Sequence, residues 1–166
     1  IIQSLRSIFN DENPNTSPID LGDIVQSVLQ ITTPEISRRN INIKLTLASK
    51  TVVLANAPEI QQVMLNLLNN AIQALSSSEQ ASKEITVETS CHAGKVELAI
   101  TDNGPGIPKE KQAKLFELTS SGKRSGMGLG LWLCKQIVMR NRGTITHQSI
   151  NTGGTRFVIK LPGEPA

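Results

Sequence analysis

Two glycine clusters frame a short basic segment in the second half of the chain. The first cluster is DNGPG at residues 102–106, and the second is GMGLG at residues 126–130. Lys123 and Arg124 lie between them. Glycine allows positive φ and close backbone approach, so its N–H groups can point at an oxyanion. The pattern is typical of a backbone cradle for a ligand that carries phosphate.

Neither cluster is decisive alone, because each also fits an ordinary turn. The second cluster runs into residues 131–138, whose apolar composition predicts a helix. A helix N-terminus offers unpaired N–H groups and the positive end of a dipole to phosphate. The elements around the clusters therefore decide the interpretation.

The best-defined helix is predicted to begin at Pro58. Its apolar residues follow the i, i+3, i+4, i+7 rule and predict a core-facing stripe: Ile60, Val63, Met64, Leu67, Leu68, Ala71, Ile72 and Leu75. Gln62, Asn66 and Asn70 form a second stripe with a spacing of four. Asn is a mediocre helix former, so this stripe is either a solvated face or a binding face.

The remaining pattern predicts a two-layer α/β sandwich. Asp20 is expected to cap a helix that Pro34 ends or kinks, with a further turn through Arg39. Alternating residues predict strands at 41–47 and 51–54, a hairpin at 85–100 that delivers Asp102, and a last hairpin at 144–161. Three helices must then cover one face of a mixed, mostly antiparallel sheet.

Composition indicates one globular domain. The chain has 166 residues, 38% hydrophobic and 19% charged, and no run long enough to span a membrane. A net charge of +3 and an aromatic content of 2% argue against a nucleic-acid partner. We therefore expect a cytoplasmic domain.

The cysteines and histidines do not predict a metal centre. Cys91 and Cys134 are not part of a C-x-x-C pair, and His92 and His147 do not complete a ligand cluster. Both cysteines fall in apolar patterns and are expected to be buried free thiols. The two histidines, in a predicted turn and a predicted strand, are expected to be structural or solvent-exposed.

The order of the motifs resembles the catalytic ATP-binding domain of sensor histidine kinases. That domain has the Bergerat fold, which it shares with gyrase, Hsp90 and MutL. The resemblance covers about residues 19–162. The matching segments are the N box at 62–71, the first glycine box at 102–106, the F box at 115–117, the second glycine box at 126–131 and the last motif at 153–155.

The resemblance implies the role of each site residue. Asp102 should accept a hydrogen bond from the adenine amine, and Thr155 should support the same edge. Asn70 should place its amide oxygen on Mg²⁺, and Asn66 should lie near the phosphates of ATP. The other positions implied to contact the nucleotide are Gly104, Gly106, Ile107, Gly126, Gly128, Leu129 and Gly130.

Catalysis is implied for Asn66, Lys123 and Arg124. The two basic residues would neutralise charge on the γ-phosphate, or they are only solvated loop charges. In the gyrase and Hsp90 branch, the position of Asn66 holds a Glu that activates water. Because an amide is no general base, we expect Mg-ATP to be held without efficient hydrolysis.

The F box departs from the family pattern. It shows a single aromatic residue, Phe116, followed by Leu118 where a second aromatic is common. The segment between the glycine boxes is also short. Both departures concern the lid and leave the nucleotide pocket unaffected; Phe116 could equally anchor the lid to the core.

The family layout also predicts the domains and partners. Residues 1–10 have helical spacing and should end the second helix of a dimerisation and phosphoacceptor hairpin, followed by a linker at 11–18, the catalytic domain at 19–162 and a tail at 163–166. Neither histidine fits the acceptor motif of that hairpin. The expected partners are the hairpin, dimeric in the full-length protein, and a response regulator. This fragment alone should be monomeric, with membrane attachment only through other regions.

Two alternatives remain open from the sequence. One is a serine protein kinase of the anti-sigma type, which shares the fold. The other is a nucleotide-binding module that regulates a partner without transferring phosphate. The motif order favours an ATP-dependent histidine kinase domain of the bacterial two-component type over both alternatives.

Overall fold

A computed structural model describes residues 15–118 and 127–164 of the chain. The elements, in chain order, are β1 (Ser17–Asp20), α2 (Leu21–Arg38), β2 (Ile41–Thr46), β3 (Val52–Ala55), α3 (Ala57–Ser76), β4 (Lys83–His92), β5 (Lys95–Asp102), α4 (Lys109–Gln112), α5 (Met127–Arg140), β6 (Thr144–Ser149) and β7 (Thr155–Pro162).

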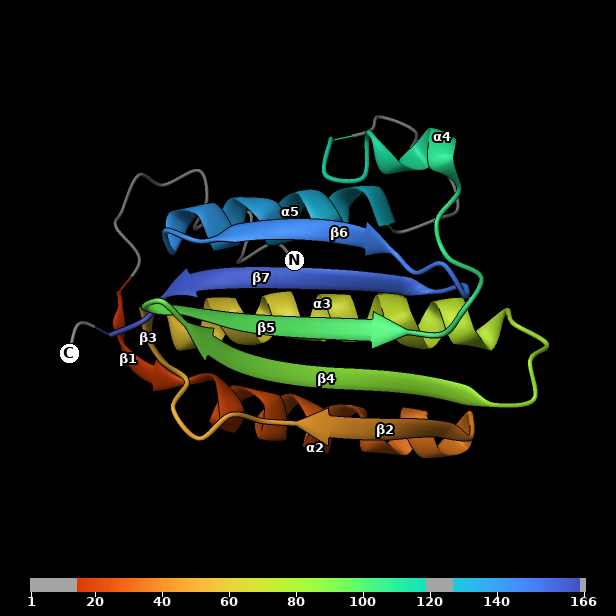
Figure 1. Cartoon of the computed structure of the whole chain (residues 1–166), viewed down its shortest axis with the longest axis horizontal. Coiled ribbons are helices and arrows are strands. Elements are labelled where there is room, and N and C mark those ends of the chain that lie inside the picture. The colour runs from red at the N-terminus through yellow and green to blue at the C-terminus, as the bar shows by residue number, and fades with distance from the viewer. Residues whose placement is uncertain (1–14, 119–126, 165–166) are drawn as a thin grey trace.

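Five strands form the main sheet in the order β2-β4-β5-β7-β6. The β2–β4 pair is parallel and the other pairs are antiparallel. Figure 1 shows α2, α3 and α5 lying behind this sheet, all on one face. The predicted two-layer sandwich with a mixed, mostly antiparallel sheet is confirmed.

The opposite face of the sheet is polar. Side chains that alternate with the core residues of β4, β5 and β7 form cross-strand ion pairs there. These pairs are Lys44–Glu84, Arg156–Glu88 and Lys160–Glu97. The first and third pairs join neighbouring strands, whereas Arg156 of β7 reaches Glu88 of β4 across β5. Such opposite charges stabilise a sheet face that no helix covers.

The central helix, α3, is well specified by its local sequence. The side chain of Asn56 accepts a 3.0 Å hydrogen bond from the backbone of Glu59 and caps the helix, and Pro58 lies in the first turn. The whole predicted apolar stripe is buried. This leaves the Gln62–Asn66–Asn70 stripe on a neighbouring, half-buried face.

The helix α2 begins at the predicted cap and continues past Pro34. Asp20 accepts hydrogen bonds from the backbone of Gly22 at 2.8 Å and from the hydroxyl of Thr51 at 2.6 Å. The helix then runs to Arg38 with Pro34 inside it. The proline removes one backbone donor, yet the helix does not end there.

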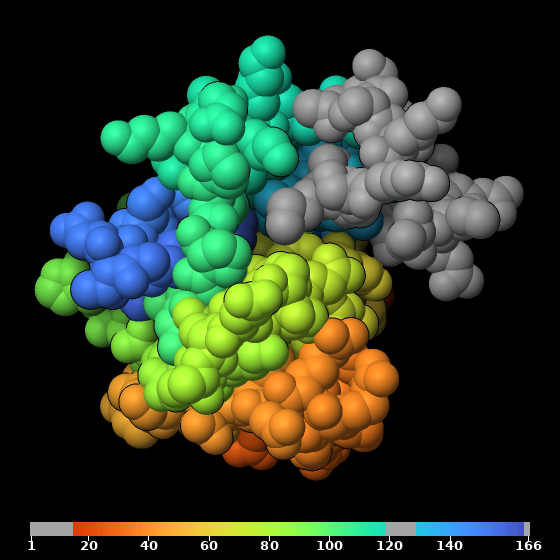
Figure 2. Space-filling view, turned by 90° about the vertical axis from the view of Figure 1, so that its right-hand side faces the viewer, coloured from red at the N-terminus to blue at the C-terminus, as the bar shows by residue number. Residues whose placement is uncertain are grey.

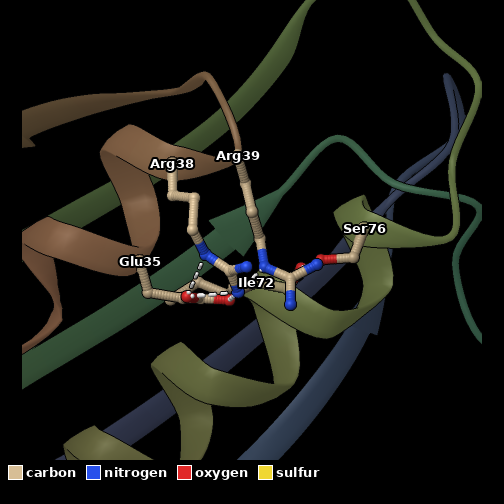
Figure 3. Close-up of polar contacts among 5 residues, drawn as sticks. All are labelled: Glu35, Arg38, Arg39, Ile72 and Ser76. Atoms are coloured by element: carbon tan, nitrogen blue, oxygen red, sulfur yellow. Dashed lines mark hydrogen bonds and ion pairs between the residues drawn. The ribbon is translucent and has the colours of Figure 1, made fainter.

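Ion pairs reinforce the last turn of α2. Glu35 bonds both Arg38, at 2.8 Å, and Arg39. These two guanidinium groups, Arg39 most strongly, lower the pKa of the Glu35 carboxyl. Figure 3 shows Arg39 extending from the end of α2 toward the part of α3 that holds Ile72 and Ser76.

The first strand, β1, was not predicted, because residues 11–18 read as a linker. It pairs antiparallel with β3 in a separate two-stranded sheet. The short strand at 51–54 therefore does not join its neighbour β2. Part of the predicted tail is also tied down, since Gly163 donates to Gly94 at 2.8 Å and Glu164 donates to Val52 at 3.1 Å. The predicted helix at 1–10 lies outside the described residues.

The prediction that both cysteines are buried was wrong for Cys91. Cys134 is buried, but Cys91 is exposed. Cys91 lies near the end of β4, and β2 pairs with β4 only as far as Glu88. The end of β4 therefore lacks a neighbouring strand on that side. Alternation along a strand cannot reveal where its neighbour stops.

Candidate nucleotide-binding site

Asp102 is a buried carboxylate at the end of β5. Its side chain is held by the backbone N–H of Gly104, which donates a 2.9 Å hydrogen bond, and the residue is 6% exposed. Burial raises the pKa of Asp102 to about 6, and backbone hydrogen bonds from Gly104 and Thr155 partly offset this. Thr155 is the cross-strand partner of Asp102 and is also buried.

The next residue, Asn103, ties the first glycine box to the loop that follows α3. Its side-chain oxygen accepts from Gln80 at 2.9 Å and from the backbone of Glu84 at 2.8 Å. Its side-chain nitrogen donates to the carbonyl of Ser82 at 3.0 Å. These hydrogen bonds could not be predicted from the sequence, because the residues that make them lie in a polar loop without periodicity.

Glycine is required where the first glycine box meets the β6–β7 turn. Gly154 has φ +111°, and a Cβ there would lie 2.1 Å from the carbonyl oxygen of Asp102. Gly106 has φ +78°, and its Cβ would lie 3.2 Å from the carbonyl oxygen of Gly154. In Figure 2 the green segment that follows β5 lies against the blue β6–β7 turn. The backbone at Gly154 lies so close to the backbone of Asp102 that only a residue without a Cβ fits there.

The segment after the first glycine box is anchored to the last two strands. The side chain of Gln112 donates to the carbonyl of Ile107 at 2.7 Å and to the hydroxyl of Ser149 at 2.9 Å. The rings of Phe116 and Phe157 pack edge to face at 6.2 Å. Phe116 therefore serves as a core anchor for the F box, one of the two roles left open by the sequence.

The two asparagines of the N box lie one turn apart on α3. Asn66 is half-buried, accepts from Gln62 at 3.3 Å and donates to the sulfur of Cys134 on α5 at 3.7 Å. Asn70 is also half-buried. No hydrogen bond from the rest of the described chain engages its carboxamide, which leaves a hard oxygen donor uncommitted. A Cβ on Gly104 would lie 3.5 Å from Cβ of Ala74, so the first glycine box packs on this helix.

The described part of the second glycine box, from Met127 onward, forms the first turn of α5. Helix was predicted from residue 131, but it begins at Met127, so Gly128, Leu129 and Gly130 are already helical. Leu129 is 40% exposed, and a Cβ on Gly130 would meet nothing within 4 Å. Gly126, Lys123 and Arg124 lie outside the described residues.

The two histidines do not join this site. His92 is exposed at the end of β4. His147 on β6 packs against Phe157 with the two rings tilted and their centroids 5.6 Å apart. Partial burial lowers the pKa of His147. In the described chain, the buried Nε2 atom of His147 has no hydrogen-bond partner.

The arrangement suits a nucleotide better than a resident metal cluster. Through the described ranges, no group of three or more His, Cys, Asp or Glu side chains could hold a metal ion. None of the helices in those ranges is both long and apolar enough to cross a membrane.

The site combines one buried acceptor, two amides and a helix N-terminus, a set that can bind a base and phosphates.

Comparison with known families identifies the domain. The model of the histidine kinase-, DNA gyrase B-, and HSP90-like ATPase family matches residues 55–165. The C4-dicarboxylate transport sensor protein DctS of Rhodobacter capsulatus is 29% identical over 171 residues, which cover 100% of this chain and 26% of DctS. The sensor protein DctB of Rhizobium meliloti is 32% identical over 162 residues, covering 97% of this chain and 26% of DctB.

A solved structure agrees with these relatives. The catalytic domain of histidine kinase ThkA superposes with a TM-score of 0.78 at 25% identity, covering 89% of this chain and 95% of that domain. The chain spans about a quarter of the length of DctS and DctB. The chain belongs to the histidine kinase-, DNA gyrase B-, and HSP90-like ATPase family, and within it to the catalytic ATP-binding domains of sensor histidine kinases.

Proposed function

We propose that this domain presents Mg-ATP to a histidine on a separate helical dimerisation domain and supports transfer of the γ-phosphoryl group to it. The observation that carries this proposal is the pair of amides, Asn66 and Asn70, on the half-buried face of α3. An amide at position 66 cannot deprotonate water. The domain would therefore hold ATP intact until the acceptor histidine arrives.

Asp102 is proposed to select adenine. Its two backbone hydrogen bonds leave acceptor capacity on an ionised carboxylate, which favours an amine over a carbonyl. Thr155, its cross-strand partner, would support the same edge of the base. The wall of the nucleotide pocket beyond Asp102 would consist of Gly104, Gly106 and Ile107. Gly104 packs on α3, Gly106 lies against the β6–β7 turn, and the carbonyl of Ile107 accepts from Gln112.

Asn70 is proposed as the protein ligand of Mg²⁺. Its carboxamide oxygen is a hard donor that no described residue engages, which fits a metal that takes few protein ligands and keeps its waters. The absence of an acidic cluster in the described chain fits a metal held mainly by phosphate oxygens. The ion would supply charge neutralisation on the phosphates.

The second glycine box is proposed to bind the phosphate oxygens. Gly128, Leu129 and Gly130 lie in the first turn of α5, whose N–H groups have no partner within the helix. Gly126 would extend this cradle, and Lys123 and Arg124 would neutralise charge that develops on the γ-phosphate. Catalysis then consists of positioning and charge stabilisation.

The proposed partners follow from the relatives. Histidine kinase ThkA has been solved in complex with the response regulator protein TrrA. We infer that the protein containing this chain likewise passes its phosphoryl group to a response regulator. Residues 1–10 would end the second helix of the phosphoacceptor hairpin, and residues 11–18 would link it to the domain. A cytoplasmic location fits this exchange.

The experiment is to incubate the purified chain with Mg-ATP for hours and to follow bound nucleotide and free phosphate together. The expected result is bound ATP that stays intact. Asp102→Asn serves as the control that should retain much less nucleotide. Steady phosphate release would contradict the role of Asn66 and indicate an ATPase, whereas failure to bind nucleotide would contradict the site itself. Added acceptor hairpin from a relative tests the transfer step directly.

A further inference from the structure

We propose that Cys134 is a positioning residue for Asn66 and sets the orientation of the Asn66 carboxamide toward the phosphates of ATP. This inference rests on the proposed function, because it assumes that Asn66 acts near the phosphates. It adds a residue of α5 that neither the glycine boxes nor the N box includes.

Cys134 lies where the two phosphate-facing helices meet. It is one turn after Gly130 on α5, and it is 0% exposed. Its sulfur accepts a 3.7 Å hydrogen bond from Nδ2 of Asn66 and lies 3.9 Å from the carbonyl oxygen of Val63. Both contacts reach α3. The thiol therefore makes a polar link between the second glycine box helix and the N box helix.

The thiol has a single proton, and its geometry assigns that proton to Val63. Burial raises the pKa of Cys134 to about 12, so the group is a neutral thiol near pH 7. Its S–H donates to the carbonyl oxygen of Val63. The sulfur lone pairs are then left for the amide nitrogen of Asn66, which is a donor.

The opposite end of the same carboxamide is fixed by Gln62. Nε2 of Gln62 donates to Oδ1 of Asn66 at 3.3 Å. Rotating the Asn66 carboxamide by half a turn would place an NH₂ group against the NH₂ of Gln62 and an oxygen against the sulfur lone pairs. While Gln62 keeps its orientation and the S–H of Cys134 stays on Val63, both contacts would be repulsive. Gln62 and Cys134 thus favour one of two orientations that have nearly the same shape.

Removing the sulfur acceptor should free this rotation without removing Asn66. Cys134→Ala and Cys134→Val both lack an acceptor, and the valine fills the space of the thiol. Cys134→Ser keeps a hydroxyl that can accept and donate. Val138→Ala is the matched control, because Val138 is equally buried on α5 and has no polar contact with α3. Asn66→Ala is the reference for loss of the amide.

The test measures the dissociation constants of Mg-ATP and of adenosine for each variant by titration calorimetry. Adenosine has the base but no phosphate. Loss of one hydrogen bond predicts that Cys134→Ala and Cys134→Val weaken ATP by about fivefold with unchanged adenosine affinity. Cys134→Ser should restore most of the ATP affinity. Val138→Ala should lower the melting temperature and leave the ratio of the ATP and adenosine dissociation constants unchanged.

The outcomes separate this inference from the proposed function. If Asn66→Ala loses ATP selectively but both acceptor-free variants bind ATP like the wild type, Asn66 acts without Cys134 and the inference is wrong. A parallel loss of ATP and adenosine would mean that Cys134 only stabilises the fold, which also overturns it. If Asn66→Ala itself leaves the ratio unchanged, the proposed phosphate role of Asn66 fails, and there is nothing for Cys134 to position.

Discussion

The backbone N–H of Gly104 donates a 2.9 Å hydrogen bond to Oδ1 of Asp102, two residues earlier in the chain. The bond turns the last side chain of β5 back against the first glycine box. A Cβ on Gly104 would lie 2.8 Å from the same oxygen, closer than a Cβ can approach without a shift. A strand end and a glycine together therefore hold one buried carboxylate in place.

We expect Asp102→Asn to bind ATP at least about tenfold more weakly. The asparagine has nearly the same shape, and its oxygen can still accept from Gly104, so the fold should remain. Its NH₂ group, however, can face the adenine amine, which is also a donor. Titration calorimetry with ATP checks this, and near-wild-type affinity would remove the adenine assignment.

The raised pKa of Asp102 predicts how stability depends on pH. Its ordinary value is 3.8, and burial raises it to about 6 in the folded chain. Between these values the folded state binds more protons than the unfolded state, so Asp102 makes stability fall as pH rises through the window. Above pH 6, the ionised Asp102 lowers the free energy of unfolding by about 3 kcal/mol.

The measurement is urea unfolding of the wild type and Asp102→Asn between pH 4 and pH 7. Because other carboxyl groups titrate in both proteins, the difference between the two isolates Asp102. The stability of the asparagine variant relative to the wild type should rise with pH across this range. A constant difference would show that the carboxyl has an ordinary pKa.

Gly154→Ala should destabilise the fold by about 3 kcal/mol or more, because its Cβ would collide with the backbone of Asp102. Gly94→Ala is the matched control, since Gly94 also has positive φ, +74°, but nothing lies within 4 Å of its Cβ. That control should cost about 1 kcal/mol. Chemical denaturation compares the two, and equal losses would mean that the close approach carries no energy.

Asn70→Ala should remove the gain in ATP affinity that Mg²⁺ provides. We expect about a tenfold loss with Mg²⁺ present, little change in excess chelator and no change for adenosine. Asn69→Ala is the control, because the same residue type lies exposed one position earlier on α3. An equal loss with and without Mg²⁺ would assign Asn70 to the nucleotide instead of the metal.

The sequence alone determined the parts of this domain that depend on local spacing. The apolar stripe of α3, the hairpin that ends at Asp102 and the order of the glycine boxes all follow from residues close together in the chain. Helix and strand periods are local properties, so burial of one face can be predicted from them.

The tertiary structure decided the contacts between distant segments. Three features of the fold depend on where strands stop and where they meet. They are the pairing of β1 with β3, the exposure of Cys91 and the close approach of Gly154 to Asp102. The link from Cys134 to Asn66 joins residues 68 positions apart. A polar pair across two helices leaves no period in the sequence, because each partner satisfies only its own local pattern. Only the packing of α5 on α3 brings the sulfur to the amide.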